Sequence, residues 1–91
     1  MSSQRKIQED LDLLEKEENL HEIVLFNDDV NTFDYVIEML MKVCEHSPQQ
    51  AEQCSIIVHN NGKCTVKTGG YKELKPRCSK LLEAGLSAEL V

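Results

Sequence analysis

A short run of apolar residues with polar residues on both sides occupies positions 22–26 and reads Glu-Ile-Val-Leu-Phe. Such a run is too short for a stable helix, so it predicts a strand that is buried on both faces. After a polar gap the apolar spacing becomes helical, at Phe33, Val36, Ile37, Leu40, Val43 and Cys44. Asn31 or Thr32 can cap the free amides at the start of this segment. We therefore expect a helix over about 32–45.

A second helix start is marked by Ser47-Pro48-Gln49-Gln50, which offers a capping hydroxyl, a proline at the first helical position and a glutamine that can reach back to the cap. Its far end is ambiguous, because the β-branched run 56–58 and the turn signal Asn61-Gly62 also fit a hairpin over 55–68. The capping box is useful only in a helix of more than two turns, and the Asn-Gly pair can end a helix in the left-handed region. We therefore favour a helix to about residue 59 and keep the hairpin as the alternative.

A third helical pattern is formed by Leu74, Cys78, Leu81 and Leu82. Gly85 ends it, and Pro76 interrupts it. Because the proline ring clashes with the carbonyl four residues earlier, we expect the regular helix to start near Glu73, with 71–72 as a lead-in turn.

Two further alternating segments, 63–67 and 86–91, read as strands, the second closing the chain. The order strand, helix, helix, strand, helix, strand predicts an α+β fold, one small three-stranded antiparallel sheet packed with three helices. Residues 1–20 are rich in charge and lack Gly, Pro and aromatic residues, which is typical of a flexible N-terminal extension. We expect one core domain over 21–91.

The charge balance narrows the class of ligand. The chain has 16 acidic and 10 basic residues, a net charge of −6, which argues against binding to nucleic acid and favours a cationic ligand. No apolar stretch approaches the roughly 18 residues of a membrane helix, and the N-terminus lacks the apolar core of a signal peptide. We expect a cytoplasmic protein without membrane attachment.

The sequence lacks the common catalytic motifs and the paired spacing of metal ligands. The sequence has no Gly-rich phosphate loop, no G-x-S-x-G and no H-E-x-x-H, so an enzyme is not expected. Asn27-x-Asp29-x-Asn31 resembles a calcium loop, but the turn position lacks glycine and a strand precedes it. Cys44, Cys54, Cys64 and Cys78 have no C-x-x-C spacing and read as reduced thiols, with a zinc site that includes His46 or His59 as the alternative. We expect neither a metal nor a cofactor.

Polar side chains that suit an ammonium group follow the first strand and end the second helix. An ammonium group has three donors and no acceptor, so a carboxylate, an amide oxygen and a neutral imidazole nitrogen suit it. Asn27, Asp28 and His59 supply these groups if the first helix packs against the second. Phe33 and Val36 would add an apolar surface beside them. A site of this kind suits a ligand with a charged amine beside an apolar side chain. The N-terminal residue of a protein is such a ligand.

These residues carry a resemblance to a known family. Val24-Leu25-Phe26-Asn27-Asp28-Asp29, the helix after it, and Val58-His59-x-x-Gly62-Lys63 resemble ClpS, the adaptor of the bacterial Clp protease. The resemblance covers about 22–90 and implies a fold like the C-terminal domain of ribosomal protein L7/L12, with a helix rather than a hairpin at 55–59.

The resemblance also implies a function and its site residues. The function is to bind N-degron peptides and proteins that begin with Phe, Tyr, Trp or Leu, and to deliver them to the N-terminal domain of a Clp AAA+ unfoldase of the ClpA or ClpC type. Asn27, Asp28 and His59 match the residues that hold the α-amino group, with Asp29 in support. The matching hydrophobic-pocket positions are Asn31, Phe33, Val36, Ser55 and Val58, and Lys75 matches a position that docks the unfoldase.

The sequence departs from the family pattern at several of these positions. Phe33 replaces a methionine that is frequent at the gate of the pocket, and Ser55 replaces a pocket methionine. Gly70 stands where the family has an acidic residue near Lys75. The alternative function is therefore an L7/L12-like interaction module that docks on an unfoldase without recognising peptides. Asp29 is expected to serve the turn after the first strand.

Overall fold

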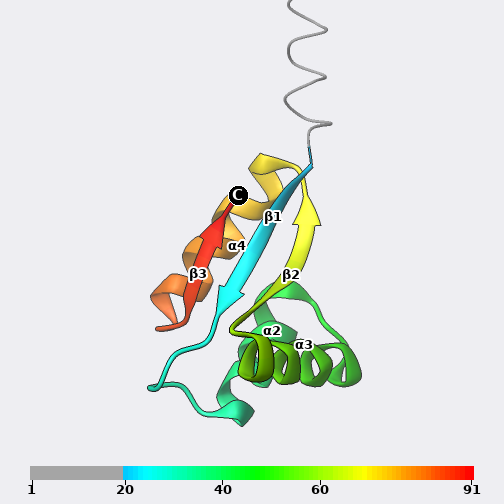
Figure 1. Cartoon of the computed structure of the whole chain (residues 1–91). Coiled ribbons are helices and arrows are strands. Elements are labelled where there is room, and N and C mark those ends of the chain that lie inside the picture. The colour runs from blue at the N-terminus through cyan, green and yellow to red at the C-terminus, as the bar shows by residue number, and fades with distance from the viewer. Residues whose placement is uncertain (1–19) are drawn as a thin grey trace, which may run out of the picture.

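The computed structural model describes residues 20–91, and the expected extension at residues 1–19 lies outside them. The elements follow the predicted order (Figure 1). They are β1 (His21–Phe26), α2 (Phe33–Cys44), α3 (Pro48–Asn61), β2 (Lys63–Gly69), α4 (Tyr71–Glu83) and β3 (Ser87–Leu90). The α+β class and the three-stranded antiparallel sheet are confirmed.

The sheet has the strand order β2-β1-β3, so β1 is central and pairs antiparallel with both neighbours. The register with β2 shifts between Ile23, which pairs with Lys67, and Val24, which pairs with Thr65, leaving Val66 as the extra residue of a bulge. The Val66 carbonyl accepts a hydrogen bond from Nε2 of the buried His46 instead. The bulge therefore fastens β2 to the segment that joins α2 and α3.

The prediction that β1 is buried on both faces is wrong. Ile23 and Leu25 are buried, whereas Val24 and Phe26 on the opposite face are only half-buried and line a shallow groove on the open side of the sheet. The core lies on the other face, between the sheet and the helices, and comprises Ile23, Leu25, Leu40, Cys44, Ala51, Val58, Val66, Leu74, Cys78, Leu81 and Leu86.

The caps of α2 and α3 agree with the sequence. The hydroxyl of Thr32 accepts from the Tyr35 amide (3.1 Å), and that of Ser47 accepts from the Gln50 amide (3.1 Å). α3 then continues to Asn61 and ends at Gly62, whose φ of 91° lies in the left-handed region. The hairpin alternative for 55–68 is therefore wrong, because the Asn-Gly pair ends a helix here.

The expected start of the third helix is also wrong. α4 begins at Tyr71, with Pro76 inside it. The amides of Glu73 (3.1 Å) and Leu74 (3.0 Å) both donate to the Gly70 carbonyl and close the first turn. Proline removes only the donor for the Lys72 carbonyl, and Lys72 is exposed, so water can take that place.

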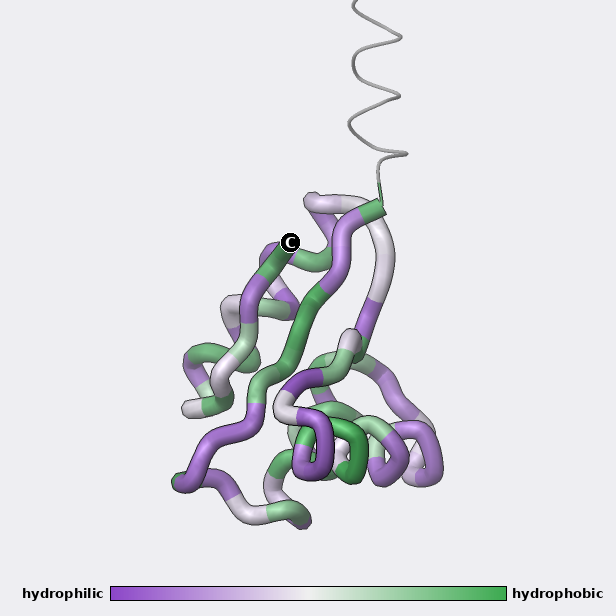
Figure 2. The backbone as a smooth tube through the Cα atoms, viewed as in Figure 1, coloured by the Kyte–Doolittle hydropathy of each residue, from purple (hydrophilic) through white to green (hydrophobic). Residues whose placement is uncertain are grey.

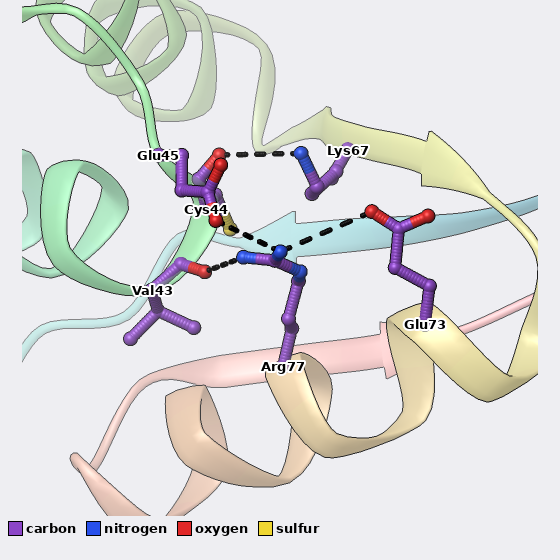
Figure 3. A network of polar contacts seen from close by, with 6 residues as sticks. All are labelled: Val43, Cys44, Glu45, Lys67, Glu73 and Arg77. Carbon is purple, nitrogen blue, oxygen red and sulfur yellow. Dashed lines mark hydrogen bonds and ion pairs between the residues drawn. The ribbon is translucent and has the colours of Figure 1, made fainter.

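Arg77 joins α4 to the end of α2, as Figure 3 shows. Its guanidinium donates to the Val43 carbonyl (2.7 Å) and to the Glu45 carboxylate (3.0 Å), with Glu73 at 3.9 Å. Val43 O is one of the free carbonyls at the negative end of α2, where a cation is favourable. The same guanidinium holds the pKa of Glu45 below its ordinary value.

Candidate functional site

The end of β1 is joined to the end of α3 by backbone hydrogen bonds. The amide of Asn27, the first residue after β1, donates to the Gly62 carbonyl (2.9 Å), and the Gly62 amide donates to the Val58 carbonyl (2.8 Å). Figure 2 shows the change from the apolar second half of β1 to the hydrophilic loop that follows it. These bonds bring the polar side chains after β1 close to the last turn of α3, which carries His59.

A pocket of about 380 Å³ opens where these segments meet. This volume lies within the range of small-ligand sites. All the positions expected for amine binding and for the hydrophobic pocket line it: Asn27, Asp28, Asp29, Asn31, Phe33, Val36, Ser55, Val58 and His59. Polar groups come from the loop and from the end of α3, and apolar groups come from α2 and α3.

The Asp28 carboxylate organises the loop. Its Oδ1 accepts from the amides of Val30 (2.9 Å) and Asn31 (2.8 Å), and its Oδ2 accepts from Nδ2 of Asn31 (2.8 Å). The pKa of Asp28 is lowered, first by the bond from the Asn31 amide, so the carboxylate is ionised at neutral pH. A carboxylate has about four acceptor positions, so one position on Oδ2 remains for a ligand.

Asn31 has a role that the sequence did not reveal. It lines the pocket, but its Nδ2 group donates both to Asp28 and to the Gly85 carbonyl (2.8 Å), 54 residues away. Tyr35 supports the same contact, since its hydroxyl donates to the Ala84 carbonyl (2.6 Å). The loop is thus fixed to the turn between α4 and β3. No local signal in the sequence links Asn31 to Gly85.

Asp29 and His59 both line the pocket and are exposed. The turn bonds that the sequence assigned to Asp29 belong to Asp28, because Asp28 is the residue whose carboxylate points at the following amides. An imidazole in its neutral form has one acceptor nitrogen, and His59 lines the same pocket as Asp28. Both residues are open to a ligand that arrives from solvent.

The inner wall of the pocket is mainly apolar. Phe33 is 42% exposed at the start of α2, whereas Val58 is 5% exposed and Ser55 is 3% exposed on α3. The Ser55 hydroxyl is buried without a hydrogen-bond partner. A second, smaller hollow shares several lining residues with this pocket, among them Val36 and Val58, and is lined in addition by Leu25 and Leu86. Neither leucine was predicted at the site.

The cysteines do not join this site. Burial raises the pKa of Cys44 to about 11 and that of Cys54 to about 12, so both are neutral thiols at pH 7. Across residues 20–91, no group of three or more His, Cys, Asp and Glu side chains is arranged to hold a metal ion. Over the same range, no helix has the length and apolar character needed to cross a membrane.

Lys75 lies away from the pocket, on the first half of α4. Its ammonium group lies 5.4 Å from the centre of the Tyr71 ring, and that ring makes an edge contact with His21, the first residue of β1. Asn27, at the pocket, follows the last residue of β1. The length of β1 therefore separates the two places.

The chain is similar to known proteins along most of its length. Residues 16–89 match the family model described as ATP-dependent Clp protease adaptor protein ClpS. An ATP-dependent Clp protease adapter protein ClpS from Helicobacter hepaticus is 34% identical over 67 residues, which cover 71% of this chain and 68% of that protein.

One from Campylobacter jejuni is 39% identical over 46 residues, which cover 50% of this chain and 48% of that protein, so the chain spans about half the length of this relative. The solved structure of Agrobacterium tumefaciens ClpS2 bound to L-phenylalaninamide superposes with a TM-score of 0.75 at 18% identity, covering 79% of this chain and 94% of that one. This likeness shows the fold. Because the family model matches well over half of the residues, the chain belongs to the ClpS family.

Proposed function

We propose that this protein is a non-enzymatic adaptor that binds the first residue of N-degron substrates, where that residue is Phe, Tyr, Trp or Leu. It then delivers the substrate to a Clp AAA+ unfoldase. The observation that carries the proposal is the ionised Asp28 carboxylate, with one acceptor position free, in a pocket of about 380 Å³ that also has an apolar side.

The polar side of the pocket suits a protonated α-amino group. Its three N–H donors are matched by the Asn27 amide oxygen, Oδ2 of Asp28 and a neutral nitrogen of His59, and bonds to an ionised group are the stronger kind. The apolar side, with Phe33 and Val36, suits the side chain of the same residue. The ligand in the A. tumefaciens ClpS2 structure, L-phenylalaninamide, has a free α-amino group beside a benzyl group.

The test compares a labelled peptide that begins with Phe or Leu with its N-acetylated copy, by fluorescence anisotropy. Acetylation removes the charge and two of the three donors, so we expect the acetylated copy to lose binding. Asp28→Ala should weaken binding of the free peptide by about tenfold or more, since a hydrogen bond to a charged group contributes about 1.5–3 kcal/mol. Equal binding of the two peptides would refute the proposal.

The partner is proposed on the family alone. A ClpS adaptor of the Clp protease requires contact with the unfoldase, and we propose that Lys75 takes part in it, on the N-terminal domain of a ClpA- or ClpC-type protein. The alternative, a docking module without peptide recognition, predicts a blocked pocket. The open pocket beside Asn27, Asp28 and His59 favours the adaptor.

A further inference from the structure

Ser55 is a polar residue in the least exposed part of the pocket wall. It is 3% exposed, its hydroxyl has no hydrogen-bond partner among the described residues, and it lines the pocket. A serine in a helix commonly donates to the carbonyl four residues earlier, which here is Ala51 O, but that bond is not made. A buried hydroxyl without a partner is unfavourable, so this one would be stabilised by a hydrogen bond from a ligand group that reaches it.

The position of Ser55 on α3 relates it to the amine site. Ser55, Val58 and His59 are spaced i, i+3 and i+4, so they share one face of the helix. Four residues of helix rise about 6 Å, which sets Ser55 about one turn inside the pocket from His59. This separation is close to the reach of an aromatic side chain from its own amino group to its far end. A ligand whose amine is held at His59 therefore points the tip of its side chain toward Ser55.

The hydroxyl of Ser55 is a polar group among apolar neighbours in the pocket wall. Val36, Val58 and Phe33 are apolar and give no hydrogen bond. The other polar groups that line the pocket lie on the loop after β1 (Asn27, Asp28, Asp29 and Asn31) and in the last turn of α3 (His59). A hydroxyl at the tip of a side chain that reaches the wall between Val36 and Val58 thus has Ser55 as a partner that can both donate and accept. A side chain without such a group leaves the serine hydroxyl unpaired, as it is in the free protein.

We propose that Ser55 is a specificity-determining residue that hydrogen-bonds the phenolic hydroxyl of a first-residue tyrosine, so that tyrosine is preferred to phenylalanine. The inference rests on the proposed function, because it needs the α-amino group to be held at Asn27, Asp28 and His59. The two residues differ by a single hydroxyl. One neutral hydrogen bond corresponds to a preference of roughly 2- to 10-fold in affinity.

The experiment measures anisotropy of three labelled peptides that differ only in the first residue: Tyr, Phe and 4-methylphenylalanine. The last fills the space of tyrosine without its hydroxyl. The full chain should bind the Tyr peptide roughly 2- to 10-fold more tightly than the other two. In Ser55→Ala the ratio of Tyr-peptide to Phe-peptide affinity should fall to about one. Ser79→Ala, the same change at an exposed position of α4, should retain the preference.

The contrary outcomes distinguish a failure of the Ser55 assignment from a failure of the amine site. A Tyr-to-Phe ratio of one in the unaltered chain overturns the assignment of Ser55. A preference for tyrosine in Ser55→Ala as large as that of the unaltered chain overturns it too. So does 4-methylphenylalanine binding as well as tyrosine, since size would then explain the preference. If acetylation abolishes binding while the ratio is one, the amine site stands and only Ser55 fails. If no free-amine peptide binds, both proposals fail.

The Ser55→Ala variant should fold, because alanine favours helix more than serine does. Circular dichroism checks this.

Discussion

The Asp28 carboxylate has two tasks in this structure. Three of its acceptor positions shape the loop through Val30 and Asn31, and one remains on a residue that lines the pocket. The loop bonds require the ionised form, because a protonated carboxyl would lose acceptor capacity. The charge that would attract an ammonium ligand is therefore also needed for the shape of the loop. This coupling explains how an acidic side chain can be stable in a pocket that also has an apolar side.

The first prediction concerns the pH dependence of this coupling. The pKa of Asp28 is below its ordinary value of 3.8 in the folded protein. A lowered pKa means that its contribution to stability is complete above the unfolded value and is lost as pH falls through the folded value. Asp28→Asn should therefore lower the free energy of unfolding by about 1–2 kcal/mol at pH 7. The difference from the unaltered chain should persist at pH 5 and shrink below pH 4. Urea titrations at each pH measure it.

Asp29→Asn is the matched control. It makes the same chemical change one residue away, on an exposed side chain to which the turn bonds do not belong. We expect its free energy of unfolding to equal that of the unaltered chain at every pH. A difference for Asp28→Asn that stays constant down to pH 3 would show that the loop does not discriminate between the charged and neutral carboxyl.

The residues at the site differ in how far the sequence could predict them. The meeting of Asn27, Asp28 and His59 could be expected, because polar residues ended a buried strand and a capped helix. The resemblance to ClpS added the remaining pocket positions. The bond from Asn31 to Gly85 could not be expected, since it depends on a residue 54 positions away. That Asp28 rather than Asp29 makes the turn bonds depends on side-chain orientation, which spacing does not encode.

The helices and strands were predictable where the signals are local. Thr32 and Ser47 cap their helices through hydroxyls that bond within three residues, so sequence alone could identify them. The errors arose where tertiary contacts decide. The burial of β1 depends on which face the helices cover. The start of α4 at Tyr71, ahead of Pro76, depends on Lys72 being exposed, so that water can take the place of the missing donor. Neither condition can be read from a local pattern.

The second prediction concerns the link between α2 and α4. Arg77→Ala removes the donor to the Val43 carbonyl and the ion pair with Glu45, and leaves the end of α2 without its cation. The Arg77 side chain is 23% exposed, so these contacts are partly shielded from solvent. We expect the free energy of unfolding to fall by about 1–2 kcal/mol. Urea unfolding followed by circular dichroism measures the change.

Two variants make the result specific. Lys42→Ala breaks the Lys42–Glu38 pair, whose side chains are 65% and 54% exposed, and should change the free energy of unfolding by less than about 0.5 kcal/mol. Arg77→Lys keeps the charge but not the forked donors, so it should lie between the alanine variant and the unaltered chain. If Arg77→Ala and Lys42→Ala lower the free energy of unfolding by the same amount, the contacts of Arg77 between α2 and α4 stabilise the fold no more than an exposed ion pair does.

At the scale of the molecule, the two proposed binding sites, the pocket and the surface at Lys75, lie at opposite ends of β1. This strand has six residues, and at about 3.4 Å per residue it spans about 20 Å. The pocket begins just after its last residue, Phe26. At its other end, the ring of Tyr71 contacts the first residue, His21, and the Lys75 ammonium group lies over the Tyr71 ring. An adaptor needs two such separate places, because the substrate must be held while the unfoldase is contacted.

The last prediction follows from this separation, and it rests on the proposed partner. Substitutions more than about 10 Å apart with no shared contacts act independently. Lys75→Ala should therefore weaken binding to the N-terminal domain of the unfoldase and leave peptide affinity within about twofold, whereas Asp28→Ala should do the reverse. Calorimetry measures the first interaction and anisotropy the second. Lys80→Ala, a lysine in the last turn of α4, should change neither. If Lys75→Ala weakens peptide binding as much as unfoldase binding, then the two ends of β1 are coupled and the adaptor is not built from independent surfaces.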